Sequence, residues 1–181
     1  SDVCSSDLNM TDKIKQVEAL IDEIYRVLDV EITERNIGTP HRIAKFWCNE
    51  VFAPKDTKEL DKVMKAFPNP APLEGTASPV ICEMEFSSVC EHHLLPFFGK
   101  CRIEYTPAEK ILGLSKFNRI VNFFSEQPQT QENLTVEICR YIKKITGGKD
   151  VRVTLYDTTH TCVECRGVRG KSNTTTTYFI D

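Results

Sequence analysis

Histidine, tryptophan and long apolar runs are all scarce in this sequence of 181 residues, which holds four histidines and one tryptophan. No apolar run approaches the ~20 residues that a membrane-spanning helix needs, and no charged and then apolar leader resembles a signal peptide. The formal net charge of −3 gives no basic excess of the kind that nucleic-acid surfaces usually show. We therefore expect a cytoplasmic protein that binds neither membranes nor nucleic acids.

Cysteine, in contrast, is abundant, with eight residues. These cysteines are scattered through segments that look like core helices and strands, and they lack the spacing of a small secreted disulfide scaffold. In a reducing compartment, cysteines that cluster with histidines favour metal binding over disulfide formation. The chain is long enough to bury a core without such covalent links.

The order of apolar patterns predicts an α+β fold with an antiparallel sheet. Helical spacing is found over residues 11–28, 38–52, 57–67, 115–124 and 131–145, and alternation typical of strands over 79–90, 99–107, 150–158 and 173–180. Thr11 and Thr39 are the expected caps of the first two helices, and Gly147 and Gly148 are expected to end the last one. Proline and glycine predict a loop over residues 68–79.

Three of the four histidines lie in two short segments, "CEHH" and "HTCVEC", that also hold cysteine. Cys90 and His93 are three residues apart and can reach one ion from a turn, while His160 and Cys162 would face the same side of a strand. A metal with three protein ligands and a water is catalytic, whereas a metal with four protein ligands is structural. Both interpretations stay open, because Cys165 would complete a closed Cys3His zinc site.

A phosphorylated ligand is indicated by a third segment. Ser115 lies at an expected helix start, with Lys116 and Arg119 on one helical face. The free N–H groups and the dipole of a helix N-terminus favour anions, so the added cations make a candidate phosphate site. A solvated helix start with no ligand explains the same residues equally well. Arg166 adds a cation close to the predicted metal.

Gln131 and Glu132 lie at the start of the next expected helix. The Glu132 carboxylate can accept two hydrogen bonds from the edge of a guanine, which presents N1–H and an exocyclic amine. An acidic residue at a helix start is also favoured by the helix dipole alone.

Taken together, five segments resemble the GTP cyclohydrolase I family. They are "TPHRIAKFW" (39–47), "CEHHLLPFFGK" (90–100), "GLSKFNRI" (113–120), "PQTQENLT" (128–135) and "HTCVECRGVR" (160–169). The resemblance extends from about residue 11 to the end of the chain. Cys165 departs from the family pattern, which usually has a small or apolar residue at that place.

The resemblance implies zinc-dependent hydrolysis and rearrangement of GTP to 7,8-dihydroneopterin triphosphate with release of formate, the first step of pterin and folate biosynthesis. It implies one zinc ion per chain, held by Cys90, His93 and Cys162. The acid–base groups would be His92 and His160. The triphosphate would contact Ser115, Lys116, Arg119 and Arg166, and the guanine would contact Gln131 and Glu132.

The family fold is the tunnelling fold, a four-stranded antiparallel sheet with two helices inserted between the strand pairs, preceded here by N-terminal helices. We expect a non-native or disordered leader over residues 1–9, an N-terminal helical region over 10–70 and the catalytic region over 71–181, all in one functional domain. The resemblance also implies a homo-oligomer, expected to be a decamer with sites at the subunit interfaces.

Three alternatives remain for the function. A structural Cys3His zinc module would bind the metal without turning over any nucleotide. A nitrile reductase of queuosine synthesis would use a thiol nucleophile and a nicotinamide cofactor, and the paired "CEHH" and "HTC" segments argue against it. A related pterin synthase would hold zinc through three histidines, and this chain lacks the third one within reach.

Overall fold

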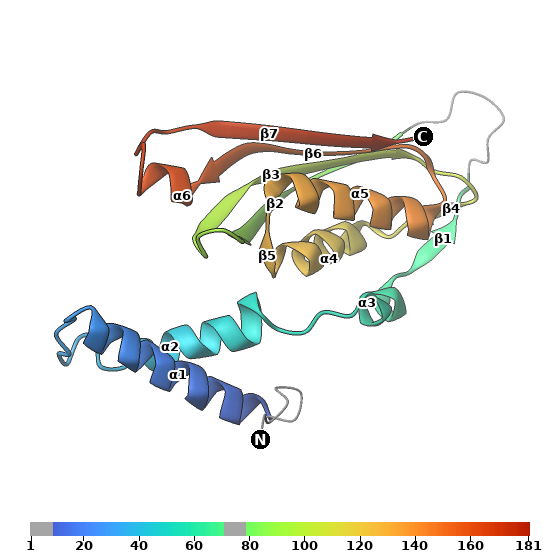
Figure 1. The fold of residues 1–181 in the computed structure, drawn as a ribbon. Helices are drawn as coiled ribbons and strands as arrows, with labels where there is room; N and C mark the ends of the chain where they lie inside the picture. Colours follow the sequence, from blue (N-terminus) through green and yellow to red (C-terminus); the bar gives the residue numbers. More distant parts are fainter. Residues whose placement is uncertain (1–8, 71–78) are drawn as a thin grey trace, which may run out of the picture. The chain divides into compact units, whose positions relative to one another are not determined.

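The computed structural model describes residues 9–70 and 79–181, which divide between Pro54 and Lys55 into two compact units (Figure 1). The expected leader lies outside the described residues except for Asn9, and so does most of the expected loop over 68–79. None of the helices in these two described ranges combines the length and the apolar character that spanning a membrane requires.

The first unit consists of α1 (Met10–Val27), α2 (Thr39–Phe46) and a π-helical turn, η2 (Trp47–Val51). Helices α1 and α2 pack together, and His41 Nδ1 lies 2.8 Å from Glu18 Oε2. The two expected caps are wrong by one or two residues. Asn9 caps α1, because its side chain accepts the Asp12 N–H, and Gly38 precedes α2 without a side-chain cap.

The main sheet of the second unit confirms the predicted α+β class. Its long strands are β2 (Val80–Cys90), β3 (Pro96–Thr106), β6 (Lys149–His160) and β7 (Asn173–Ile180), each antiparallel to the next. A fifth strand, β5 (Pro128–Gln129), pairs in parallel with the end of β2. The sheet therefore has five strands where four were expected, because a strand of two residues is too short to show alternation.

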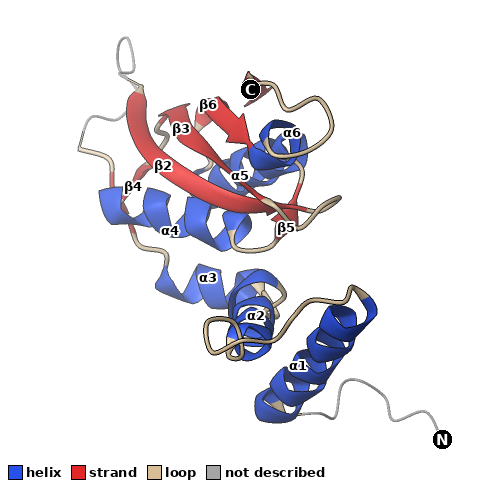
Figure 2. Cartoon of the chain, turned by 90° about the vertical axis from the view of Figure 1, so that its left-hand side faces the viewer, coloured by secondary structure: helices blue, strands red, loops and turns tan. Residues whose placement is uncertain are grey.

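Two helices, α4 (Leu114–Ser125) and α5 (Gln131–Thr146), cover one face of this sheet (Figures 1 and 2). Their apolar stripes are buried as the spacing predicts, with Phe117, Ile120, Leu134 and Ile138 fully inaccessible to solvent. Burial of one such side chain contributes ~1.5–3 kcal/mol, so the two helices are held mainly by the sheet. Gly147, at φ +60°, ends α5 as expected.

The second unit also contains a separate two-stranded sheet. Helix α3 (Thr57–Val63) is followed by β1 (Ala66–Pro68), which pairs with β4 (Lys110–Leu112). The helix expected over 57–67 therefore ends four residues early, because residues 66–68 pair with a distant strand instead. The Tyr141 hydroxyl donates to Asp61 Oδ1 at 2.7 Å and ties α3 to α5.

Candidate active site

The "CEHH" segment forms a tight turn at the end of β2. The N–H groups of His93 and Leu94 both donate to the Cys90 carbonyl, at 3.3 and 2.9 Å. Leu94 has φ +52°, in the left-handed region, which reverses the chain toward β3. The turn brings the His93 ring back over the strand end, so that its Nδ1 lies 3.7 Å from Cys90 Sγ.

The second half of the site comes from the end of β6. Because β6 runs antiparallel to β3, His160 pairs with Phe97 at the start of β3. The chain then enters the short helix α6 (Thr161–Glu164). The hydroxyl of Thr161, its first residue, donates to the Pro96 carbonyl at 2.6 Å. This contact places the buried Cys162 beside the turn that follows β2.

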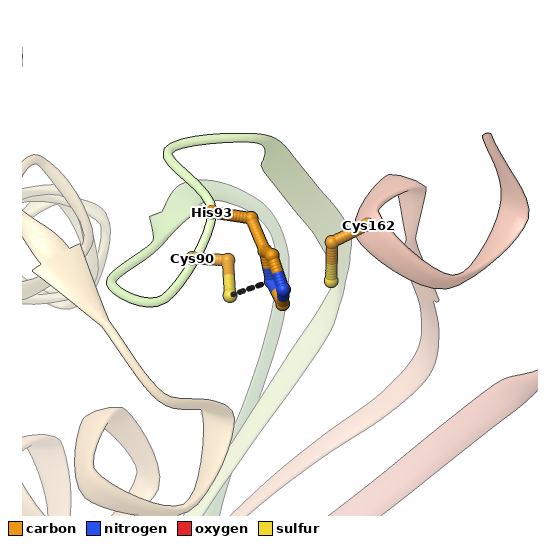
Figure 3. A group of neighbouring side chains, drawn as sticks. All are labelled: Cys90, His93 and Cys162. Atoms are coloured by element: carbon orange, nitrogen blue, oxygen red, sulfur yellow. Dashed lines mark hydrogen bonds between the residues drawn. The ribbon is translucent and has the colours of Figure 1, made fainter. Parts of the chain in front are cut away.

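Cys90, His93 and Cys162 each offer one ligand atom, and these atoms all lie within 4.8 Å of one another (Figure 3). Zn–S bonds of about 2.3 Å in a tetrahedral site place two sulfurs ~3.8 Å apart, so the group needs to tighten by only about an ångström. Burial, and next the neighbouring Cys90, raise the pKa of the Cys162 thiol. A divalent cation supplies the positive charge that two adjacent thiolates require, so the donor set fits a metal.

Cys165 does not belong to this group. It lies exposed at the end of α6, where its N–H donates to the Thr161 carbonyl. Among the described residues, the candidate ligand group thus holds three members.

His92 and His160 have different surroundings. The His92 ring is exposed, with Nδ1 3.9 Å from Cys90 Sγ and Nε2 3.5 Å from Glu91 Oε1. The His160 ring is half-buried, stacks on Phe97 at 4.9 Å and 7°, and places Nε2 2.8 Å from Gln131 Oε1. Burial lowers the pKa of His160, against a smaller opposite effect of the Glu132 carboxylate.

One cavity of about 240 Å³ unites most of the predicted site residues. Its lining includes Cys90, His92, His93, Gln131, Glu132, His160 and Cys162. The lining comes from the turn after β2, the start of β3, the start of α5 and the end of β6 with α6. The start of α5 lies at this end of the sheet because β5, directly before it, pairs with the end of β2. Residues that the sequence spacing predicted to share one site therefore line one cavity.

The predicted phosphate contacts are divided. Arg166 reaches the site, with Nη1 2.8 Å from His93 Nε2. Ser115, Lys116 and Arg119 lie in the first two turns of α4 as expected, but they do not line the 240 Å³ cavity. Arg119 instead lines a separate cavity with residues of α3.

Two residues that shape the site were missed by the sequence analysis. Phe97 supports the His160 ring, and Thr161 anchors α6 to β3. A buried phenylalanine in a strand gives the same signal as any core residue, and a threonine at a helix start gives the same signal as any cap. Only the register between β3 and β6 distinguishes them.

Comparison with known proteins places the chain in a family. The profile of the GTP cyclohydrolase I family matches residues 15–181. The GTP cyclohydrolase 1 of Edwardsiella ictaluri is 36% identical over 163 residues, which cover 90% of this chain and 72% of that protein. The GTP cyclohydrolase 1 of Tolumonas auensis is 37% identical over 177 residues, which cover 95% of this chain and 78% of that protein.

A solved structure, the archaeosine synthase QueF-Like in the apo form, is 19% identical with a TM-score of 0.44 and covers 57% of this chain and 95% of its own. That likeness is too weak to carry an argument. The family profile and the curated relatives each span most of the chain, and they include both halves of the site described above. This chain belongs to the GTP cyclohydrolase I family.

Proposed function

We propose that this protein is a zinc-dependent GTP cyclohydrolase, which converts GTP to 7,8-dihydroneopterin triphosphate and releases formate. The observation that carries the proposal is the convergence of three metal-ligand side chains and His160 on one cavity. Membership of the family supports the same reaction.

Zinc is the proposed metal, one ion per chain, held by Cys90, His93 and Cys162. Two thiolates and an imidazole are a ligand set that zinc prefers, and three protein ligands leave a place for water. Bound zinc would supply Lewis-acid chemistry and lower the pKa of that water to about 7.

The chain's own groups move the protons. In the proposed reaction a water adds to C8 of the purine and a second water releases C8 as formate. The ribose then opens, rearranges and closes onto the freed amines with loss of one water. His160 donates a proton to the imidazole ring of the base as it opens. His92, exposed at the cavity, is the candidate for proton transfer in the later steps.

Guanine recognition is assigned to Glu132, whose exposed carboxylate lines the cavity. This carboxylate can accept hydrogen bonds from both N–H groups of the guanine edge. Gln131 lines the cavity wall next to it with its side-chain amide bonded inside the protein. The proposal predicts that a purine without these two N–H groups is rejected.

The triphosphate is assigned to Ser115, Lys116, Arg119 and Arg166. The cavity of about 240 Å³ is smaller than the ~300–1,000 Å³ that typical small-molecule sites offer, so it suits the base and leaves the phosphates outside. We propose a homodecamer in which α4 of one chain completes the phosphate site of a neighbour.

Because the chain belongs to the family, we assign its fold to the tunnelling class. The four antiparallel strands would be β2, β3, β6 and β7, with α4 and α5 between the two strand pairs. The division into a helical region over 10–70 and a catalytic region over 71–181 stays a prediction. So does the cytoplasmic location.

The test is incubation of metal-loaded protein with GTP and, separately, with ATP, while formate is measured. The proposal predicts formate from GTP and none from ATP, because adenine lacks the two N–H groups that would donate hydrogen bonds to Glu132. Bound metal without formate from either nucleotide would contradict the proposal and favour a structural zinc module.

A further inference from the structure

We propose that Gln131 is a positioning residue, which holds the His160 imidazole in a single orientation with the proton on Nε2. This inference rests on the proposed acid–base function of His160. It assigns Gln131 a different task from the guanine contact that the family resemblance implies.

The orientation of the Gln131 amide is fixed by its surroundings. The side chain is only 2% exposed. Its Nε2 lies 3.3 Å from the Leu155 carbonyl on β6 and 3.4 Å from the Thr174 carbonyl on β7. Because carbonyl oxygens can only accept, the amide nitrogen must face them, and the amide oxygen must face the opposite way.

The amide oxygen therefore acts on His160. Gln131 Oε1 lies 2.8 Å from His160 Nε2, and an oxygen that can only accept requires a proton on that nitrogen. In the neutral ring, His160 Nδ1 keeps its lone pair, so it is the nitrogen that first takes up a proton and then donates it to the substrate. The Phe97 ring, stacked parallel to the imidazole at 4.9 Å, fixes the plane in which this nitrogen lies.

The backbone around Gln131 is built to hold this position. Gln131 is the first residue of α5, and Thr130 caps the helix by accepting the Asn133 N–H at 3.1 Å. The Thr135 hydroxyl donates to the Gln131 carbonyl at 2.7 Å. Both amide hydrogens are directed to protein carbonyls, which leaves neither of them for the edge of a guanine.

Gln131→Met and Gln131→Glu separate the possible roles. Methionine keeps the volume and removes the acceptor, so kcat for formate release should fall by about 10- to 100-fold while KM for GTP stays within about twofold. Glutamate, protonated because it is buried against two carbonyls, keeps an oxygen toward His160 and should recover most of kcat.

Gln129→Met is the matched control. Gln129 is equally buried at 2%, and its amide bonds to the Phe124 carbonyl, Glu137 and Asn133 rather than to His160. Its replacement removes a comparable number of hydrogen bonds. A loss of kcat in Gln131→Met that exceeds the loss in Gln129→Met by at least about fivefold would support positioning. Equal losses would overturn it, as would a rise in KM with kcat unchanged.

The tautomer itself has a readout that does not need turnover. In protein labelled with ¹⁵N-histidine, with His160 assigned by its absence in His160→Gln, the neutral ring should carry its proton on Nε2. Gln131→Met should add the Nδ1-protonated form. The same single tautomer in both proteins would overturn the inference, whereas wild-type protein that shows the Nε2 tautomer but releases no formate would contradict the proposed function alone.

Discussion

Cys162 reaches the other two candidate ligands only because α6 begins directly after β6 and is tied to Pro96 by the Thr161 hydroxyl. Cys165 lies three residues further along the same segment and faces solvent. Two cysteines of one C-x-x-C segment thus have different surroundings, and the proposed metal site predicts a measurable difference between them.

Cys162→Ala should lose the metal, and formate release should fall by at least about 100-fold, because Lewis-acid catalysis contributes several kcal/mol. Cys165→Ser should keep both metal and activity, since its side chain lies outside the ligand group. Metal content per chain and formate release, measured on both variants, check this. Loss of metal from Cys165→Ser would instead indicate a closed four-ligand site.

His160→Gln should keep the metal, since His160 is not in the ligand group, and lose about 100- to 10,000-fold in kcat, as expected for removal of an acid–base group. The check is again metal content together with formate release. A variant that loses its metal would show that His160 is a ligand.

Most residues of the candidate site were predictable from the sequence, because the candidate ligands stand in short motifs whose spacing limits which of them can reach one ion. The sequence could not decide between Cys165 and an open position, since C-x-x-C spacing permits either. It also could not reveal the contact from Gln131 to His160, because that contact depends on two carbonyls from β6 and β7.

At the scale of elements, α3 is attached to α5 through polar side chains. The Tyr141 hydroxyl donates to Asp61, and Lys144 lies 3.0 Å from the second Asp61 oxygen. The Tyr141 hydrogen bond, followed by Lys144, lowers the pKa of the Asp61 carboxyl below its ordinary value. The same pairing, after burial, raises the pKa of Tyr141.

This pairing predicts a pH dependence of stability. A carboxyl whose pKa is lower in the folded state contributes stability above its unfolded pKa of about 4, and loses it as pH falls through the folded value. Asp61→Asn should therefore be less stable than wild type at pH 7, and the difference should shrink below about pH 4. Thermal midpoints from pH 3 to 7 check this, with Glu59→Gln as a control on the same helix. A difference that does not change with pH would contradict the assigned contact.

The long elements were predictable, because α4, α5 and the four long strands each extend over several periods of their apolar pattern. The short strands β1, β4 and β5 were not. Each has two or three residues and exists through pairing with a distant partner, as Ala66 does with Leu112. The predicted end of α3 was wrong for the same reason, because residues 66–68 pair with β4 instead of continuing the helix.

At the scale of the whole molecule, the first unit leaves an apolar stripe of α1 in contact with solvent. Leu20, Ile24 and Val27 are 64%, 48% and 69% exposed and follow one another at helical spacing. Exposed apolar patches of this kind mark interaction surfaces. The proposed homodecamer gives this stripe a partner in another chain.

Val27→Asp should therefore reduce the assembly to smaller species, because a charge would be buried at the contact between chains. Ala19→Asp adds the same charge on the polar face of α1, near Lys15 and Glu23, and should leave the mass unchanged. Light scattering gives the mass of both variants. An unchanged mass of Val27→Asp would contradict a contact through this stripe.

The order of apolar patterns predicted the fold class but nothing specific about assembly, since an amphipathic helix has the same pattern whether it covers its own core or another chain. The helical face predicted for α1 is real, yet only Ile21 on it is buried among the described residues of that helix. Assembly was expected from the family resemblance alone.

In the proposed function, the activity depends on a metal ion bound by Cys90, His93 and Cys162. This dependence is tested most directly by adding zinc in steps to metal-stripped protein and measuring formate release from GTP at each step. We expect no formate release without zinc and a rate that rises linearly until each chain holds one ion. Full activity in the metal-free protein, or no formate at one zinc per chain, would contradict it.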